Sequence, residues 1–279
     1  MLKTRVITAL VLLAVLLLIL VLNSYAVFAL ALAAFFGAAA WESMRLFGAR
    51  LPLQGAALWT AAFLFLAFMR AETSLPLPFI VLIGISALSW ALRLAPSLAI
   101  GLPPLESVGN RILNVTYDLS ILACFVAMLA LFQRSTLYLF SVLAIVWIAD
   151  IGAYFSGKAF GKRKLAPSIS PGKSWEGVVG GWLAVLLLAT VSTRIPELHD
   201  TFAVKLQLAW GWVGFIAALS VIVAASVVGD LFESQLKRRI AMKDSSNLLP
   251  GHGGVLDRID ALLLAAPALW YAQAIHLRF

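Results

Sequence analysis

The sequence is poor in charged residues and in cysteine. Only 12% of its 279 residues are charged, whereas 62% are hydrophobic. An ordinary soluble domain has about 25% charged residues, and one core of this size cannot bury so many apolar side chains. The composition excludes a soluble enzyme, a secreted module and a disordered chain, and it predicts an integral membrane protein. The single cysteine, Cys124, excludes a disulfide within the chain and, because it lies in an apolar run, is expected to be a buried thiol.

Long apolar runs fill most of the chain. A helix needs about 20 apolar residues to span a bilayer, because its backbone polar groups must be paired within the helix. The runs predict an all-α, polytopic integral membrane protein with about nine transmembrane helices and a cytoplasmic N-terminus. The expected spans are 6–22, 25–41, 55–69, 75–92, 119–132, 135–155, 177–195, 209–229 and 259–275.

Two regions follow from this division. Residues 1–130 are expected to form an N-terminal set of helices that serves as scaffold, dimer interface or lipid entry, and a homodimer is left open. Residues 131–279 are expected to form the catalytic membrane region. The stretch 93–118 contains three prolines and is expected to be a loop with an interfacial piece.

Acidic residues are scarcer than basic ones, at 13 against 21. With nine spans, sixteen of the 21 Lys and Arg residues fall on the side of the N-terminus and five on the other. Basic residues concentrate on the cytoplasmic side of membrane proteins, so two polar loops, 156–176 and 230–258, are expected to face the cytoplasm. The basic excess indicates topology and an anionic ligand at this face, and nucleic acid is not expected.

Four aspartates lie where apolar runs meet these cytoplasmic loops, and a carboxylate at the edge of the hydrocarbon must be paired, hydrated or metal-bound. They are Asp150, Asp230, Asp257 and Asp260. One interpretation is local ion pairs with Lys237, Arg238 and Arg258. The other is a metal site, and hard carboxylate oxygens without a Cys or His cluster favour Mg²⁺ over zinc. We predict that Asp230 and Asp257 bind Mg²⁺, with Asp260 and Asp150 as further candidates.

A Gly-Lys-Ser turn precedes the span at 177. It resembles the end of a P-loop, but Pro167 stands where that motif needs glycine, so a Walker A motif is excluded. Lys173 and Ser174 at a helix start still favour phosphate binding. Glu176 is either a capping residue or a functional acid, and both interpretations remain open.

The segment from Ser234 to Asp260 carries a motif. It reads Ser-Gln-Leu-Lys-Arg from residue 234, Lys-Asp from residue 243, and Pro-Gly-His-Gly-Gly-Val-Leu-Asp-Arg-Ile-Asp from residue 250. This segment resembles the signature of the phosphatidate cytidylyltransferases, also called CDP-diacylglycerol synthases. The upstream segments 150–154, 170–177 and 229–234 are also similar to the family, with Ser174 where threonine is common.

The resemblance implies a nucleotidyltransferase that uses Mg²⁺ to condense CTP with phosphatidic acid, giving CDP-diacylglycerol and pyrophosphate for phospholipid biosynthesis. It implies a multi-pass protein of the cytoplasmic (inner) membrane, surrounded by membrane lipids, with its active site facing the cytoplasm. We assign catalytic roles to Asp230, Asp257, Lys237, Arg238 and Arg258. The residues expected to bind substrate are Lys173, Ser174, Glu176, Ser234, Lys243, Asp244, His252, Gly253 and Gly254.

Two other functions remain as alternatives. A CTP-dependent kinase acting on a polyprenol-type lipid would use a similar membrane architecture and metal chemistry but transfer the γ-phosphate. A transporter also uses charges within membranes, but here the charges gather at one face rather than at the midplane.

Overall fold

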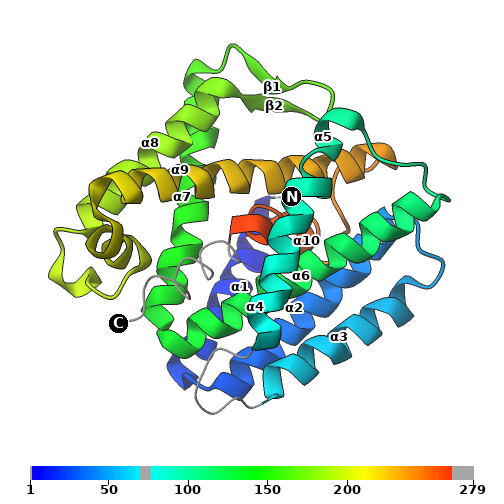
Figure 1. The fold of residues 1–279 in the computed structure, drawn as a ribbon, viewed down its shortest axis with the longest axis horizontal. Helices are drawn as coiled ribbons and strands as arrows, with labels where there is room; N and C mark the ends of the chain where they lie inside the picture. The colour runs from blue at the N-terminus through cyan, green and yellow to red at the C-terminus, as the bar shows by residue number, and fades with distance from the viewer. Residues whose placement is uncertain (1, 70–76, 266–279) are drawn as a thin grey trace.

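The structure, a computed structural model, describes residues 2–69 and 77–265 and is almost entirely helical (Figure 1). The elements are α1 (Leu2–Leu22), α2 (Tyr25–Leu46), α3 (Pro52–Phe68), α4 (Leu77–Ser89), the π-helix η1 (Trp90–Leu94), α5 (Ser97–Ile100), α6 (Val108–Arg134), α7 (Thr136–Phe160), β1 (Lys164–Ala166), β2 (Ser170–Ser174), α8 (Trp175–Ser192), the 3₁₀ helix η2 (Pro196–Leu198), α9 (Phe202–Arg239) and α10 (Leu256–Ile259).

The predicted all-α membrane fold is confirmed. Within the described residues, six helical segments are long and apolar enough to cross a membrane, and α3 is a shorter apolar helix. Eight of the nine predicted spans coincide with helices, and the ninth, 259–275, lies mostly outside the described residues. The chain is therefore a multi-pass membrane protein.

The largest difference from the sequence prediction is the start of α6. The stretch before residue 119 was expected to be a loop, but α6 begins at Val108, where the Ser107 hydroxyl accepts a hydrogen bond from the Asn110 backbone amide at 3.1 Å. Asp118 lies inside the helix, where it accepts hydrogen bonds from Ser43 Oγ at 2.5 Å and from Asn114 Nδ2 at 3.0 Å. Because partners within the fold satisfy these polar groups, a helix forms where the polar sequence indicated a loop.

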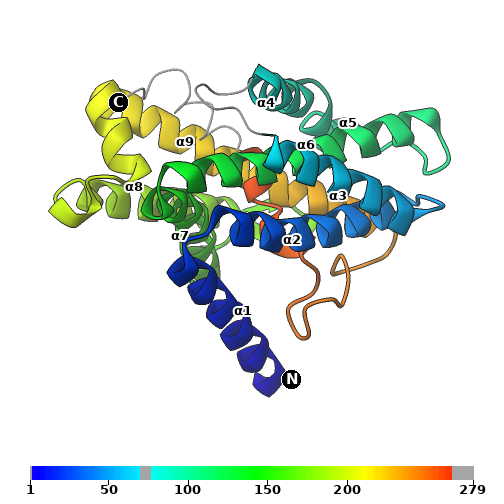
Figure 2. The ribbon, with the colours of Figure 1, turned by 90° about the horizontal axis from the view of Figure 1, so that it is seen from below.

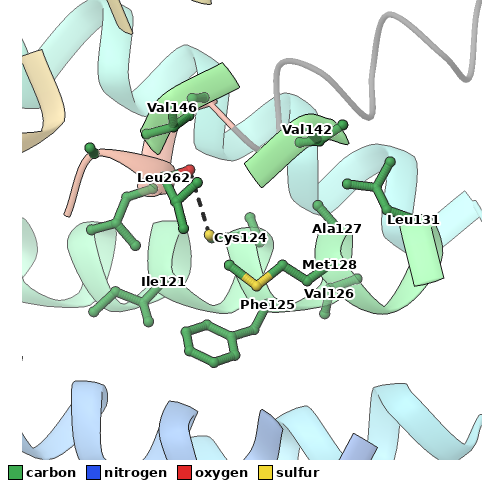
Figure 3. Packing of buried hydrophobic residues seen from close by; sticks show 14 of the residues in the cluster. Ile121, Cys124, Phe125, Val126, Ala127, Met128, Leu131, Val142, Val146 and Leu262 are labelled. Atoms are coloured by element: carbon green, nitrogen blue, oxygen red, sulfur yellow. Dashed lines mark hydrogen bonds between the residues drawn. The ribbon is translucent and has the colours of Figure 1, made fainter. Parts of the chain in front are cut away.

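Helix α6 forms the centre of the core, with α2 and α3 beside it (Figures 1 and 2). Phe125 of α6 contacts Phe36, which stacks on Phe63 with ring centroids 5.2 Å apart. The predicted buried thiol is confirmed, since Cys124 is fully buried and its Sγ donates to the Leu262 carbonyl at 3.5 Å (Figure 3). Helix α1, in contrast, projects away from the other helices (Figure 2).

Helices α7 and α8 pack through glycines. A Cβ atom added at Gly152 would lie 3.0 Å from the Gly181 Cα, and one added at Gly181 would collide with the Ala149 carbonyl oxygen. Small residues allow such close approach between membrane helices. This packing sets the position of the hairpin segment 161–174, which joins the two helices.

We expect Gly181→Ala to destabilise the protein by about 1–3 kcal/mol, because the new methyl group forces α7 and α8 apart. Gly84→Ala is the matched control, since nothing lies within 4 Å of its added Cβ. Thermal unfolding of the detergent-solubilised protein measures both changes. Equal midpoints for the two variants would contradict the packing argument.

The two polar segments expected as loops are partly regular. The first contains an antiparallel hairpin of β1 and β2, in which Lys164 pairs with Ser174. The second begins as helix, because α9 continues to Arg239 instead of ending near residue 229. Gly211 interrupts α9 with φ of 63° and ψ of −174°, a left-handed conformation that glycine adopts without strain.

Candidate active site

The centre of the candidate site is an ion pair between two residues of the signature. Lys237 Nζ, on the last turns of α9, lies 2.6 Å from Asp257 Oδ1 on α10 and 2.9 Å from Glu233 Oε2 one turn earlier in α9. The Lys237 side chain is 10% exposed, that of Asp257 5%, and that of Glu233 is fully buried. Removing one partner of such a buried pair leaves an uncompensated charge, so the three side chains form a unit.

The second carboxylate oxygen of Asp257 is held by the loop before α10. Asp257 Oδ2 accepts hydrogen bonds from the backbone amides of Ser245 and Gly254, both at 2.8 Å, and from Ser245 Oγ at 3.0 Å. Burial alone would raise the pKa of Asp257, but the bonds from Lys237 and from these amides hold that pKa below its usual range. Asp257 is therefore a fixed, ionised carboxylate.

A cavity of about 550 Å³ opens next to this unit, between α7, β2, α8 and α9. Asp150, Lys173, Ser174 and Asp230 line it. Lys173 forms an ion pair with Asp230, whose Oδ1 also accepts a hydrogen bond from Ser234 Oγ at 3.2 Å. The structure thus brings residues from the two polar segments, which are about 60 positions apart in the chain, to one opening.

Asp260 connects the cavity with the ion pair. Its carboxylate is close enough to interact electrostatically with Asp230, Glu233 and Lys237. Helix α9 can approach Asp260 only because residue 229 is glycine, since a Cβ there would collide with the Asp260 carbonyl oxygen. Five carboxylates, those of Asp150, Asp230, Glu233, Asp257 and Asp260, therefore form one network with only two lysines, Lys173 and Lys237, among the described residues.

Comparisons with known proteins show the family to which this chain belongs. A family model described as the cytidylyltransferase family matches residues 3–276, nearly the whole chain. The chain belongs to the cytidylyltransferase family. It is 43% identical over 282 residues to the phosphatidate cytidylyltransferase of Pseudomonas aeruginosa, covering 98% of both chains. It is 39% identical over 289 residues to that of Haemophilus influenzae, covering 97% of this chain and 98% of the relative. These matches confirm the family resemblance inferred from the signature.

A third relative matches over a shorter stretch. The phosphatidate cytidylyltransferase of Bacillus subtilis is 41% identical over 146 residues, which cover 51% of this chain and 49% of that protein. The division of the chain near residue 130 itself stays a prediction.

The glycines of the cytidylyltransferase signature let the loop close on these carboxylates. Gly253 has φ of +85°, and a Cβ on it would lie 2.6 Å from Asp257 Oδ2. At Gly254 a Cβ would collide with Ser245 Oγ and with a carboxylate oxygen of Glu42. Both glycines thus allow the loop backbone to lie close to these side chains. The backbone of His252 donates to the Leu249 carbonyl at 2.8 Å, while its buried Nδ1 has no hydrogen-bond partner in the described part of the chain.

Several predicted site residues lie away from the ion pair. Glu176 accepts hydrogen bonds from the backbone amides of Lys162 at 3.1 Å and Arg163 at 3.2 Å, so it organises the start of the hairpin. Arg238 is directed to the Ile169 carbonyl at 3.3 Å and to the Met242 carbonyl at 3.2 Å. Ser174 Oγ caps α8 by accepting from the Gly177 amide at 3.1 Å. Their roles toward substrate stay predictions.

Three further charged residues of the signature segment are exposed. The side chains of Lys243, Asp244 and Arg258 are exposed. Exposed cations at the rim suit a polyanion that arrives from solvent. Their assignment to substrate also stays a prediction.

Sequence reasoning missed two acids of the site, Glu233 and Glu42. Glu233 stands in the signature segment one helical turn before Lys237, and the i, i+4 spacing was the available signal. Glu42 lies in α2, fully buried, and contacts the signature loop more than 200 residues later in the chain. Its only signal was an acid at the end of the second apolar run.

Proposed function

We propose that this chain transfers the cytidylyl group of CTP to phosphatidic acid, giving CDP-diacylglycerol and pyrophosphate. The observation that carries the proposal is the buried unit of Lys237, Glu233 and Asp257, built from the signature of the cytidylyltransferase family. Two relatives that match this chain over nearly their full length are named phosphatidate cytidylyltransferase, which supports phosphatidic acid as the lipid substrate.

The proposed reaction joins two polyanions. A phosphate oxygen of phosphatidic acid attacks the α-phosphorus of CTP, the bond to the β-phosphate oxygen breaks, and pyrophosphate leaves with that electron pair. No general base is needed, because a phosphate monoester is already ionised near neutral pH. The work of the protein is to hold the reactants in line and to neutralise their charge. Lys237 and Lys173 supply positive charge at the site, and Arg238, Lys243 and Arg258 supply it at the rim.

The donor set fits a magnesium ion. Among the described residues no three Asp, Glu, His or Cys side chains form a ready cluster. Mg²⁺ does not need one, since it takes one or two carboxylates and completes its shell with water and phosphate oxygens. Asp150 and Asp230 line the same cavity, and the excess of carboxylates over lysines favours a cation there. Bound Mg²⁺ would neutralise charge on the phosphates.

We propose Asp230 as the principal Mg²⁺ ligand, with Asp150 and Asp260 as further candidates. Asp257 was predicted to share the ion with Asp230, and this stays a prediction. Among the described residues, three donors bind Asp257 Oδ2 and only Lys237 binds Oδ1, so Oδ1 is the oxygen with a lone pair left for a metal ion.

The proposed location is the cytoplasmic (inner) membrane, with the site facing the cytoplasm. The bacterial relatives and the excess of Lys and Arg in the two polar segments support it. Membrane lipids would surround the apolar helices and deliver phosphatidic acid. Assembly as a homodimer stays a prediction from the sequence.

Two labels on CTP test the reaction. We expect purified protein with phosphatidic acid and Mg²⁺ to transfer label from the α-phosphate of CTP into lipid and to release pyrophosphate. A lipid kinase would instead transfer the γ-phosphate label and release CDP. Label in lipid from γ-labelled CTP, or none from α-labelled CTP, would contradict the proposal, and omission of Mg²⁺ tests the metal.

A further inference from the structure

Glu42 is a fully buried carboxylate on an otherwise apolar face of α2. Its Oε1 accepts hydrogen bonds from Ser246 Oγ at 2.5 Å and from the Val255 amide at 3.0 Å. Its Oε2 accepts from Ser245 Oγ at 3.1 Å and from the Leu256 amide at 2.6 Å. All four donors belong to the loop before α10 or to the first residue of α10. Burying a carboxylate costs free energy unless hydrogen bonds compensate the loss of water. The donors of this loop provide that compensation, so the Glu42 side chain binds the loop.

Ser245 joins Glu42 to the ion pair. Its hydroxyl lies 3.1 Å from Glu42 Oε2 and 3.0 Å from Asp257 Oδ2, so both carboxylates compete for one hydroxyl proton. Glu42 also holds the amides of Val255 and Leu256, the two residues before Asp257. Glycine at 254 leaves the space through which the Glu42 carboxylate reaches this backbone.

We propose that Glu42 is a positioning residue of the transfer reaction: it fixes the loop 245–256 and so orients Asp257 against Lys237. The inference rests on the proposed function and gives the N-terminal helices a role in the reaction. Glu42 acts through the loop and touches no reacting group. A carboxylate suits this task because each of its oxygens accepts two hydrogen bonds.

Glu42→Gln tests the inference with almost no change in size. An amide has one oxygen, so its NH₂ group must face the Val255 amide or the Leu256 amide, and donor then meets donor. Ser43→Ala is the matched control. Ser43 is the next residue of α2, and its hydroxyl donates to Asp118 of α6 at 2.5 Å. The control therefore breaks a buried bond of the same helix and leaves the loop contacts in place.

The experiment compares full-length wild type, Glu42→Gln and Ser43→Ala at equal amounts of folded protein. We expect Glu42→Gln to lower kcat/KM for CTP about 10- to 100-fold, because Lys237 and Asp257 no longer share one orientation. Hydrogen–deuterium exchange of a peptide that contains residues 254–256 is expected to speed up in Glu42→Gln and not in Ser43→Ala. A merely structural role would lower the folded fraction alone and leave kcat/KM per folded molecule at the wild-type value.

A wild-type kcat/KM for CTP in folded Glu42→Gln would overturn the inference. If Glu42→Gln does not accumulate, Ser246→Ala decides, since the Ser246 hydroxyl donates to Glu42 Oε1 at 2.5 Å and, among the described residues, forms no hydrogen bond with Asp257. A lowered kcat/KM for CTP in that variant supports the inference, and the wild-type kcat/KM overturns it. Absence of cytidylyl transfer in the wild type would instead refute the proposed function, which keeps the two failures apart.

Discussion

Asp257→Asn is expected to abolish the conversion of CTP and phosphatidic acid, with a loss of about 100-fold or more in kcat. Asparagine keeps the size of the side chain but offers one acceptor atom. In either orientation its NH₂ group faces a donor, either Lys237 on one side or the amides of Ser245 and Gly254 on the other. Position 257 then carries no negative charge, and the side chain no longer offers acceptors on both sides, to Lys237 and to the loop amides of Ser245 and Gly254.

The control for this variant is Glu106→Gln. It makes the same acid-to-amide change at an exposed position before α6, outside the site. We expect it to retain wild-type turnover. The measurement is label transfer from α-labelled CTP at saturating Mg²⁺, with the amount of membrane-inserted protein determined in parallel. Near-normal turnover of Asp257→Asn would remove Asp257 from the site.

Lys237→Met is expected to lower kcat/KM about as much as Asp257→Asn does. It is expected to destabilise the protein more than Asp257→Asn. Methionine keeps the length of the apolar stem but leaves Glu233 and Asp257 without the cation between them. Breaking a buried pair by removing one partner costs about 3–5 kcal/mol. Two neighbouring carboxylates also repel each other, so the loop before α10 is expected to shift and substrate phosphates lose a cation.

Lys205→Met is the matched control, because it lies in the same helix α9 toward its N-terminal end. Its ion pair with Asp200 is long, at 3.9 Å, and partly exposed, so its loss costs about 1 kcal/mol at most. Thermal unfolding and label transfer are measured for both variants. A Lys237→Met protein as stable and active as Lys205→Met would show that the buried pair is dispensable.

The sequence predicted the helices well where apolar runs were long and uninterrupted. It failed at the start of α6 and at the end of α9, because both carry polar side chains that reasoning along the chain assigns to loops. Asp118 in α6 is satisfied by Ser43 of α2, and Lys237 in α9 by Asp257 of α10. Partners from other elements make these polar turns compatible with a helix, and no local pattern reveals them.

The site was predicted in part. The signature placed Lys237 and Asp257 in one region, and their pairing follows from two elements that are adjacent in the chain. Arg238 and Glu176 were predicted for the same site. Their side chains bind backbone groups in the structure, and their roles toward substrate stay predictions. Residue type and spacing could not separate them from Lys237, because the direction of a side chain depends on the fold around it.

The amino-acid sequence by itself determined that this chain is a helical membrane protein of the cytidylyltransferase family, because apolar run length and a dense motif are local properties. Only the tertiary structure decided which charges meet. Asp230 pairs with Lys173 across the cavity, and Glu42 joins the signature loop from a distant helix. The physical reason is that burial makes an unpaired charge costly, so each carboxylate takes the partner that packing brings within reach, however far away in the chain that partner lies.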